Sequence, residues 1–411
     1  MKKLFFILIL FVGSIPAMAT TWRVSPQGAL HSIQQAIRQA KPGDTIEVLK
    51  GVYYEKNLVV DKPVYLKGID NPALDGEHTY EVITIKSSGV TVEGFQIRHS
   101  GKSSLQDIAG IKISNVQQVT IRNNIFDDNY FGIYCETALK CSIVKNTLRS
   151  YAKAEFQSGD GIHAWKSDSL EISGNTINGF RDGIYFEFVT NSNIRNNTSE
   201  NNIRYGLHFM FSHNDEYTAN TFRKNGTGVT IMYTHGIIMR QNIFAENWGS
   251  ASYAILMKDI SDSDVANNLF EQNTVGIYME GSNRLSIRQN RFKSNGWALK
   301  IQASCDENTI TKNNFTGNTF DVATNGSLVL NDFTGNYWDK YEGYDLNRDG
   351  IGDVPYRPVS MYSMIVERNP TAMMLFRSFM VSLLDKAEKV LPGVTPENLK
   401  DDKPYMKAFD L

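Results

Sequence analysis

The chain has 411 residues, of which 41% are hydrophobic and 21% are charged, and its formal net charge at pH 7 is −2. This near balance of charge provides no basic surface for phosphates, which argues against a nucleic-acid partner. The three cysteines, Cys135, Cys141 and Cys305, are an odd number without CxxC spacing. We therefore expect buried free thiols rather than a disulfide framework or a thiolate metal site.

Residues 1–19 have the features of a secretory signal peptide. Lys2 and Lys3 precede an apolar run at residues 4–12, and Ala17 and Ala19 provide the small side chains of a cleavage site. Removal of this segment lowers the formal net charge to −4, because Lys2 and Lys3 leave with it. No later stretch approaches the roughly 20 apolar residues that a membrane span requires, so we expect an exported protein that is soluble after processing.

The first elements expected after the signal are a short helix and a strand. Residues 32–40 carry apolar side chains at helical spacing, and residues 45–48 (TIEV) are rich in β-branched side chains. We expect the helix to cap a repeat domain, because an uncovered first coil would expose its apolar interior and its backbone edge.

An asparagine recurs through the middle of the chain with steps of 22, 29, 22, 23, 22, 26, 22 and 23 residues. The positions are Asn124, Asn146, Asn175, Asn197, Asn220, Asn242, Asn268, Asn290 and Asn313. A glycine followed by an aliphatic residue recurs in phase with them. A repeat of this length, built from short β-rich runs and turn residues, predicts an all-β fold, a parallel β-helix with one coil of about 22 residues per repeat. We expect the asparagines to adopt left-handed torsions at corners and to stack amide on amide.

Two long steps indicate insertions, at residues 151–160 and 248–253, and loops that leave a solenoid often carry its binding surface. The periodicity stops after Asn336. We therefore assign residues 20–336 to the β-helix with its cap and residues 337–411 to a C-terminal tail. Apolar residues at helical spacing over residues 370–391 predict an amphipathic helix in this tail, ended by Pro392.

The recurring glycine sets the phase of the strand that follows it. Residues one and three places after the glycine are apolar or small and are expected to point inward, whereas those two and four places after it are expected to face solvent. The second set comprises Tyr134, Glu136, His163, Trp165, Tyr185, Glu187, His208, Met210, Thr230, Met232, Tyr278 and Glu280.

Two methionines in this outward set form a repeated Met-x-x-His motif. Met210 precedes His213, and Met232 precedes His235, with one coil of 22 residues between the pairs. Equivalent atoms in adjacent coils should lie about 4.8 Å apart, and His208 should lie on the same face about 6.7 Å from Met210. Thioethers and imidazoles together favour a soft cation, so the motif predicts a copper site, with copper(I) the preferred ion.

A structural alternative for the same residues stays open. The outward methionines would cover a docked loop or a partner, and the histidines would occupy turns without binding a metal. Met257 and Met279 fall on the inward register and are expected to belong to the core.

The tail contains a loop that is similar to the first nine positions of a calcium-binding loop. Asp345, Asn347, Asp349 and Asp353 provide oxygen atoms at alternate positions, with a glycine at the sixth place. The twelfth position is Tyr356, so the usual closing glutamate is missing. The loop is therefore a candidate calcium site at the end of the solenoid, and a turn held by Asx hydrogen bonds is the alternative.

Asp160, Asp182 and Glu187 lie near one face of the coils and are the acids considered for catalysis. The sequence contains no catalytic triad, metal-hydrolase motif or phosphate loop, and we expect no lysine or arginine base beside the stacked aspartates. An enzyme of the polysaccharide lyase or epimerase type and a passive exported scaffold remain as alternatives to a metal-binding protein.

The chain resembles the NosD family, the exported copper-maturation proteins of nitrous oxide reductase. The segments that carry this resemblance are residues 205–213 (YGLHFMFSH), 276–280 (GIYME), 336–339 (NYWD), 343–345 (GYD) and 370–406. The combination of the Met/His coil with the tail is more specific than the aspartate-rich loop, which also occurs in unrelated exported β-helices.

The resemblance implies a right-handed β-helix in the periplasm that works in denitrification. It implies an ABC transporter of the NosF and NosY type, contacted through the C-terminal tail, which would make the protein peripheral to the inner membrane. It also implies a NosL-type copper chaperone and nitrous oxide reductase as further partners. No catalytic residue is implied, so we expect a non-enzymatic accessory protein. The copper ligands predicted above rest on register and ligand chemistry and not on a family motif.

Overall fold

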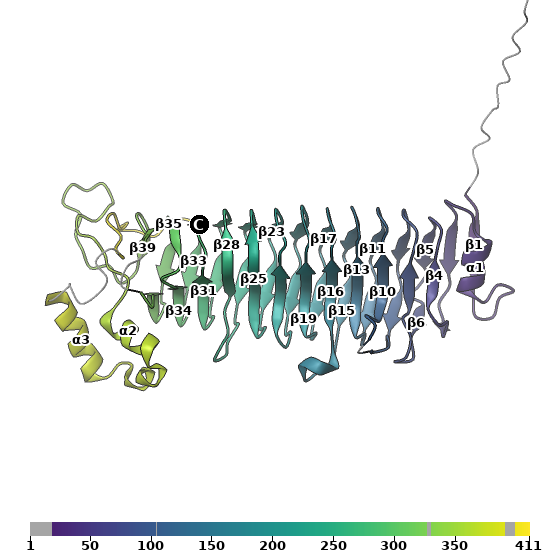
Figure 1. Cartoon of the computed structure of the whole chain (residues 1–411), viewed down its shortest axis with the longest axis horizontal. Coiled ribbons are helices and arrows are strands. Elements are labelled where there is room, and N and C mark those ends of the chain that lie inside the picture. Colours follow the sequence, from purple (N-terminus) through teal and green to yellow (C-terminus); the bar gives the residue numbers. More distant parts are fainter. Residues whose placement is uncertain (1–18, 104, 327–329, 391–398) are drawn as a thin grey trace, which may run out of the picture.

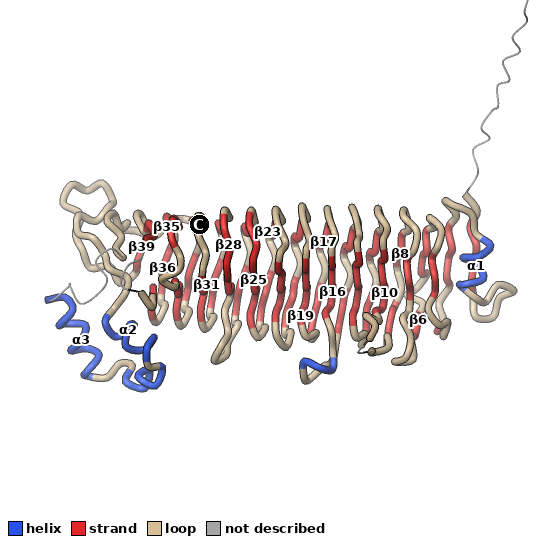
Figure 2. Tube along the Cα trace, viewed as in Figure 1, coloured by secondary structure: helices blue, strands red, loops and turns tan. Residues whose placement is uncertain are grey.

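The computed structural model describes residues 19–103, 105–326, 330–390 and 399–411. The predicted signal peptide lies outside the described residues except for Ala19. The described chain is an elongated solenoid with helices at both ends (Figure 1). Its strands align in columns along the long axis (Figure 2) and form three parallel sheets. There are about 14 turns of about 23 residues each, which confirms the predicted parallel β-helix.

Sheet 1 contains, in spatial order, β1 (Thr21–Val24), β2 (Thr45–Val48), β5 (Tyr65–Gly68), β8 (Thr91–Glu93), β11 (Thr120–Arg122), β14 (Ser142–Val144), β17 (Glu171–Ser173), β20 (Asn193–Arg195), β23 (Glu216–Thr218), β26 (Ile238–Arg240), β29 (Asp264–Ala266), β32 (Ser286–Arg288), β35 (Asp306–Thr311) and β38 (Leu330–Asp332). Sheet 2 contains β4 (Leu58–Val60), β7 (Ile83–Ile85), β10 (Ala109–Ser114), β13 (Phe131–Glu136), β16 (Asp160–Trp165), β19 (Asp182–Glu187), β22 (Tyr205–Met210), β25 (Thr227–His235), β28 (Ile255–Ser261), β31 (Val275–Glu280), β34 (Trp297–Ile301) and β37 (Phe320–Ala323). Sheet 3 contains β3 (Val52–Tyr53), β6 (Ala73–Asp75), β9 (Gln96–Arg98), β12 (Ile125–Asp127), β15 (Thr147–Arg149), β18 (Thr176–Asn178), β21 (Thr198–Glu200), β24 (Thr221–Arg223), β27 (Ile243–Ala245), β30 (Leu269–Glu271), β33 (Arg291–Lys293), β36 (Asn314–Thr316) and β39 (Tyr337–Trp338). Each complete turn of the solenoid contributes one strand to each sheet, so residues one turn apart become neighbours across a sheet.

The recurring asparagines form a buried hydrogen-bonded ladder. The Oδ1 atom of Asn220 accepts the backbone N–H and the side-chain Nδ2–H of Asn197, at 3.0 Å each. Its own Nδ2 donates to the carbonyl oxygen of Ile194 at 2.8 Å and to Asn242 Oδ1 at 3.1 Å. The predicted amide stack is therefore confirmed, and its hydrogen bonds fasten each turn to the next.

The predicted left-handed torsion of these asparagines is wrong by one residue. The positive φ belongs to the residue before each asparagine, as at Ala219 (φ 55°) and Gln241 (φ 56°). The preceding residue turns the corner, and the asparagine that follows can then point inward and bond to its neighbours. A second buried ladder, which the sequence analysis missed, runs along another corner through Asn202, Asn225, Asn247, Asn273, Asn295 and Asn318.

The interior is filled by apolar side chains that stack from turn to turn. Phe244, Phe270 and Phe292 lie two residues after their ladder asparagines and stack with ring centroids 4.9 and 4.7 Å apart. Met257 and Met279 are fully buried, as expected from their inward register. The cysteines Cys135, Cys141 and Cys305 are free and buried, which confirms the expectation of unpaired thiols.

The N-terminal end is covered by α1 (Ile33–Gln39), as predicted. Ile33, Ala36 and Ile37 are buried on its inner side. Ser32 caps the helix by accepting the backbone N–H of Gln35, and Glu55 accepts the N–H of Ile33 at 2.5 Å. These acceptors satisfy N–H groups that the first helical turn leaves free.

The C-terminal tail is less regular than the single helix predicted for residues 370–391. It contains α2 (Met361–Arg368), which the sequence analysis missed, a 3₁₀ helix η2 (Pro370–Leu375) and α3 (Phe379–Val390). Arg377 has a φ of 62°, so the backbone cannot continue as one helix between η2 and α3. The predicted stop at Pro392 lies outside the described residues. None of the helices described is both long and apolar enough to cross a membrane.

Residues 399–411 return to the last coil and close it. Asp401 is fully buried, and its carboxylate accepts the backbone N–H groups of Gly335 and Asn336, both at 2.8 Å, and the indole Nε1–H of Trp338 at 2.9 Å. The tail therefore supplies the final rung of the asparagine ladder.

Three loops leave the solenoid between sheet 3 and sheet 2, at residues 99–108, 150–159 and 246–254. The second contains the 3₁₀ helix η1 (Glu155–Gln157) and includes most of the insertion predicted at residues 151–160. The Lys102 ammonium donates to the Phe156 carbonyl, so the first two loops touch. Gly159 lies against the ring of Phe131, and Asp107 hydrogen-bonds to Tyr134, so both loops help to cover the outer face of sheet 2.

We predict that Asn220→Ala lowers the free energy of unfolding by about 3 kcal/mol, because it leaves several buried hydrogen-bonding groups without partners. Chemical denaturation followed by circular dichroism measures this difference. Asn193→Ala is the matched control: this side chain is exposed on β20, and its loss should cost less than about 0.5 kcal/mol. Equal stability of the two variants would show that the ladder does not stabilise the fold.

Candidate metal centre

The two outward methionines are neighbours on sheet 2. Met210 ends β22, and the parallel register pairs it directly with Met232 in β25. Both side chains are half-buried. Across the sheet, Glu187 pairs with Met210 on one side and Lys258 pairs with Met232 on the other. The two thioethers therefore lie between two charged side chains in this row of paired residues. The predicted stacking of the methionines is confirmed, while their role as ligands stays a prediction.

The two histidines of the Met-x-x-His motif also stack. The rings of His213 and His235 have centroids 4.0 Å apart and an interplanar angle of 12°. The backbone N–H of His235 donates to Nδ1 of His213 at 3.3 Å. Burial, and next the charge that His235 would carry, lower the pKa of His213, which favours the neutral ring that a metal ligand requires.

Between the methionines and the histidines runs a stack of aromatic rings that the sequence analysis did not identify. Phe211 stacks on Phe188 and on Tyr233, with centroid separations of 5.3 and 5.1 Å. All three residues have positive φ and remain exposed. Their signal in the sequence is an aromatic residue five places after the recurring glycine in three successive coils.

His208 lies on the same face but apart from this group. It is 8% exposed, with its ring against those of Tyr185 and Tyr205 at 5.0 and 4.9 Å. Neither ring nitrogen has a hydrogen-bond partner among the described residues. Burial, and next the charge of Arg204, lower the pKa of His208 to about 4. The expected exposure of His208 is therefore wrong, although its place as a ligand is untested.

Other outward-register residues are buried as well, contrary to the prediction that they face solvent. Tyr134 is buried, with its ring stacked on His163 at 4.5 Å, and Thr230 is buried beside His208. The ring of His163 and the loop residue Asp107 cover Tyr134. The two-residue period of a strand assigns a face, but it does not say what lies over that face.

The acids considered for catalysis form a buried charged network with arginines. Asp160 accepts from Arg181 Nη2 and contacts His163 Nδ1, both at 2.8 Å, and Asp182 accepts from Arg204 at 2.6 Å. Burial opposes ionisation of Asp160, but His163 and Arg181 hold its pKa below the usual range. Burial raises the pKa of Asp182 to about 6.

This network corrects the expectation that no lysine or arginine accompanies the stacked aspartates. Arg181 and Arg204 occupy equivalent positions in successive coils, just before their sheet 2 strands, and this repetition is visible in the sequence. The negative charges of the two aspartates are balanced by the positive charges of the two arginines. The network therefore stabilises the corner that leads into the sheet 2 strands. Glu187 is half-buried in the row that contains Met210, and within the described residues it makes no hydrogen bond or ion pair with this network.

The candidate calcium residues mainly bind their own backbone. Asp345 accepts the N–H groups of Asp349 and Gly350, and Asn347 also accepts that of Asp349. Asp353 accepts the N–H of Leu346 at 2.6 Å. These are the Asx-type bonds of the alternative interpretation, and calcium binding at this loop stays a prediction.

Among the described residues, one group of three histidine or acidic side chains has potential ligand atoms all within 4.8 Å of one another. It consists of His78, His99 and Asp128. The sequence analysis missed it, although the steps of 21 and 29 residues resemble the spacing of the coils.

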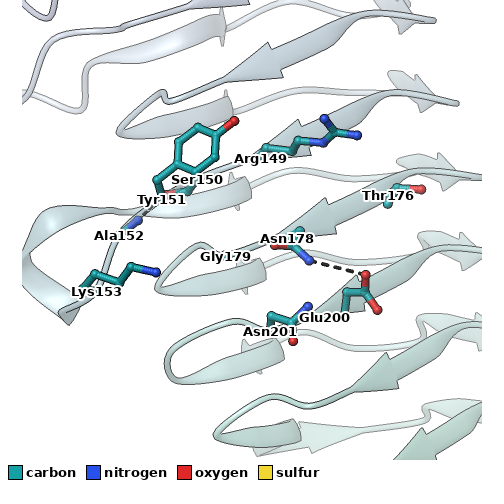
Figure 3. Close-up of a pocket in the computed structure, with 10 residues that line it drawn as sticks. All are labelled: Arg149, Ser150, Tyr151, Ala152, Lys153, Thr176, Asn178, Gly179, Glu200 and Asn201. Atoms are coloured by element: carbon teal, nitrogen blue, oxygen red, sulfur yellow. Dashed lines mark hydrogen bonds between the residues drawn. The ribbon is translucent and has the colours of Figure 1, made fainter.

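Two hollows in the surface contain none of the predicted copper ligands. A shallow groove of about 430 Å³ lies on sheet 3 beside residues 150–153 (Figure 3), where Asn178 donates to Glu200 at 3.4 Å. A larger cavity of about 920 Å³ lies between the last coils and the tail, lined in part by Phe320, Asp321 and Phe376.

The chain is similar to known proteins with the β-helix fold. Residues 149–343 match the family model described as "Periplasmic copper-binding protein (NosD)", and residues 66–177 match a right-handed β-helix region. The "Probable ABC transporter binding protein NosD" of Pseudomonas aeruginosa is 28% identical over 94% of this chain and 96% of its own length. The protein of the same name from Stutzerimonas stutzeri is 24% identical over 86% of this chain and 85% of its own length.

Solved structures with this fold have diverse functions. The surface adhesin PfbA of Streptococcus pneumoniae has a TM-score of 0.57 and 13% identity, covering 71% of this chain and 86% of its own. The A-module of the mannuronan C-5 epimerase AlgE6 of Azotobacter vinelandii has a TM-score of 0.54 and 13% identity, covering 75% and 96%. At such identities the likeness shows the fold alone.

We predict that His208 makes the protein less stable in acid. The unfolded chain takes up a proton at this residue below pH 6.5, whereas the folded protein does so only near pH 4. Stability is therefore lost as the pH falls from 6.5 toward 4, and this residue should account for about 2 kcal/mol between pH 7 and pH 4.5. Denaturant titrations at both pH values on the wild type and His208→Gln measure it. An equal loss in both proteins would contradict the prediction.

Proposed function

We propose that this chain, which belongs to the NosD family, is a non-enzymatic periplasmic accessory protein that binds copper(I) and hands it on for the maturation of nitrous oxide reductase. The observation that carries the proposal is the pairing of Met210 with Met232 in register on the outer face of sheet 2. The matched family description supports copper as the ion and the periplasm as the location.

Ligand chemistry favours copper(I) over harder ions at this face. Thioethers are soft ligands that oxygen-preferring cations do not select, and neutral imidazoles bind copper as well. The stacked rings of His213 and His235 lie in nearly parallel planes, and Nδ1 of His213 already accepts the backbone N–H of His235, so binding one ion together with the sulfur atoms requires at least one ring to turn. The exposure of His235 leaves room for that rotation. His208 is a further candidate, because neither of its ring nitrogens makes a hydrogen bond within the described chain, and Nδ1 lies 4.0 Å from an oxygen of Asp182.

The partner proposed for the tail is an ABC transporter of the NosF and NosY type, which would make the protein peripheral to the inner membrane. The relatives named as ABC transporter binding proteins support this association. The inner side of the tail, with Tyr362 and Val381, packs in one apolar cluster with Phe320 at the solenoid end. Its outer side leaves Met374 and Phe379 exposed by 85% and 83%, which is typical of an interaction surface.

A NosL-type chaperone as copper donor and nitrous oxide reductase as acceptor complete the proposal. Both must reach the Met/His face, which the half-buried thioethers and the exposed aromatic stack leave accessible. The enzymatic alternative is less well supported, because the buried aspartates are already paired with arginines and the epimerase likeness is one of fold alone.

We predict that Met210→Ala/Met232→Ala weakens copper(I) binding by at least about tenfold for each lost thioether, or about 1.4 kcal/mol each. Anaerobic titration of the mature protein against a competing chelator measures the affinity. His213→Ala/His235→Ala should weaken binding as well. The matched control is Met373→Ala/Met374→Ala, two exposed methionines of the tail that should leave the affinity unchanged. Equal affinity of the Met210/Met232 variant and the wild type would remove the site, and no copper binding by the wild type would favour the scaffold alternative.

We predict that Met374→Glu/Phe379→Glu reduces capture of the protein by the detergent-solubilised transporter at least about tenfold, because a buried charge opposes apolar docking. Thermal unfolding should be unchanged, since both side chains are exposed. A truncation before Pro370 would also remove Asp401 and uncap the solenoid, so point substitutions are the cleaner test. Leu105→Glu, an exposed apolar residue in a distant loop, is the control. Undiminished capture would place the transporter contact elsewhere.

A further inference from the structure

Three corners in successive coils bring nitrogen and oxygen ligands together at the N-terminal part of the solenoid. His99 and Asp128 directly follow β9 and β12, and His78 lies three residues after β6. Their φ angles are 54°, 55° and 53° for His78, His99 and Asp128. The shared left-handed backbone repeats the turn, and the potential ligand atoms of the three side chains all lie within 4.8 Å of one another.

One histidine of this group is already oriented by a carboxylate. His99 Nδ1 lies 3.1 and 3.2 Å from the two carboxylate oxygens of Asp75, and a carboxylate can only accept, so Nδ1 carries the proton. Asp75 is buried and is itself held by Arg98 at 2.8 Å. The lone pair of His99 therefore sits on Nε2 and is available. A histidine held by a buried carboxylate is the usual support of a metal ligand.

The other two side chains have no competing polar partner. Within the described chain, neither the His78 ring nor the Asp128 carboxylate makes a hydrogen bond or an ion pair. The rings of His78 and His99 stack with centroids 4.4 Å apart at 27°. His78 is exposed, so its ring can tilt to direct a nitrogen toward the other two ligands.

We propose that His78, His99 and Asp128 form a second metal site, specific for a borderline divalent cation such as Zn²⁺ or Cu²⁺. Two imidazoles and one carboxylate suit these ions, and three protein ligands leave a coordination position open to water or to a partner. The site contains no sulfur and lies on other coils than Met210 and Met232. The site is therefore independent of the proposed copper(I) function. An ion bound there would link three consecutive turns of the solenoid.

Calorimetric titration of the chelator-stripped, tag-free mature protein with Zn²⁺ tests the proposal. We expect micromolar or tighter binding, weakened at least about tenfold in His78→Asn/His99→Asn. Asparagine tolerates the left-handed torsion, so the metal-free variant should unfold at the same temperature as the wild type. His31→Asn, an exposed histidine outside both groups, is the matched control. Asp75→Asn tests the positioning role and should weaken binding while leaving both imidazoles in place.

Two further results separate this site from the copper(I) site. Met210→Ala/Met232→Ala should keep the Zn²⁺ affinity of the wild type, and electron paramagnetic resonance of the Cu²⁺-loaded protein should show nitrogen coupling that disappears in His78→Asn/His99→Asn. Wild-type affinity or unchanged nitrogen coupling in the histidine variant would overturn the proposal, as would the absence of Zn²⁺ binding to the wild type.

Discussion

The structure depends on the fixed register between successive turns. The buried asparagine ladders maintain this register. Each ladder amide accepts from one neighbouring turn and donates to the backbone of the preceding coil, as Asn220 does with Asn197 and Ile194. A shift by one residue would break these bonds and turn the inward side chains outward. Because the register cannot slip, residues one period apart in the sequence become lateral neighbours. The candidate sites on the surface follow from this constraint.

Features that depend on the repeat alone were predictable from the sequence. The parallel β-helix, the inward Met257 and Met279 and the pairing of Met210 with Met232 all follow from period and phase. The α1 cap follows from apolar residues at helical spacing before the first coil. The burial of His208 was not predictable in this way, because it depends on the rings of Tyr185 in the neighbouring strand and Tyr205 at the start of its own strand.

Contacts between segments far apart in the sequence could not be predicted from the repeat pattern either. Asp401 lies 65 residues from Asn336 in the sequence, and no period connects them. His78, His99 and Asp128 do follow the coil spacing, but irregular steps around an inserted loop hide it. Arg181 and Arg204 repeat in register, but they stand before the recurring glycines, and the inward and outward alternation applies only to the strand positions after each glycine.

The last rung differs chemically from all the rungs before it. An amide both donates and accepts, so a ladder that ended in asparagine would offer an unfinished template to any similar chain. Asp401 presents only acceptor oxygens, and Gly335, Asn336 and Trp338 already donate to them. The carboxylate thus terminates a ladder whose open end would expose unpaired backbone groups, the kind of edge on which a second chain can add.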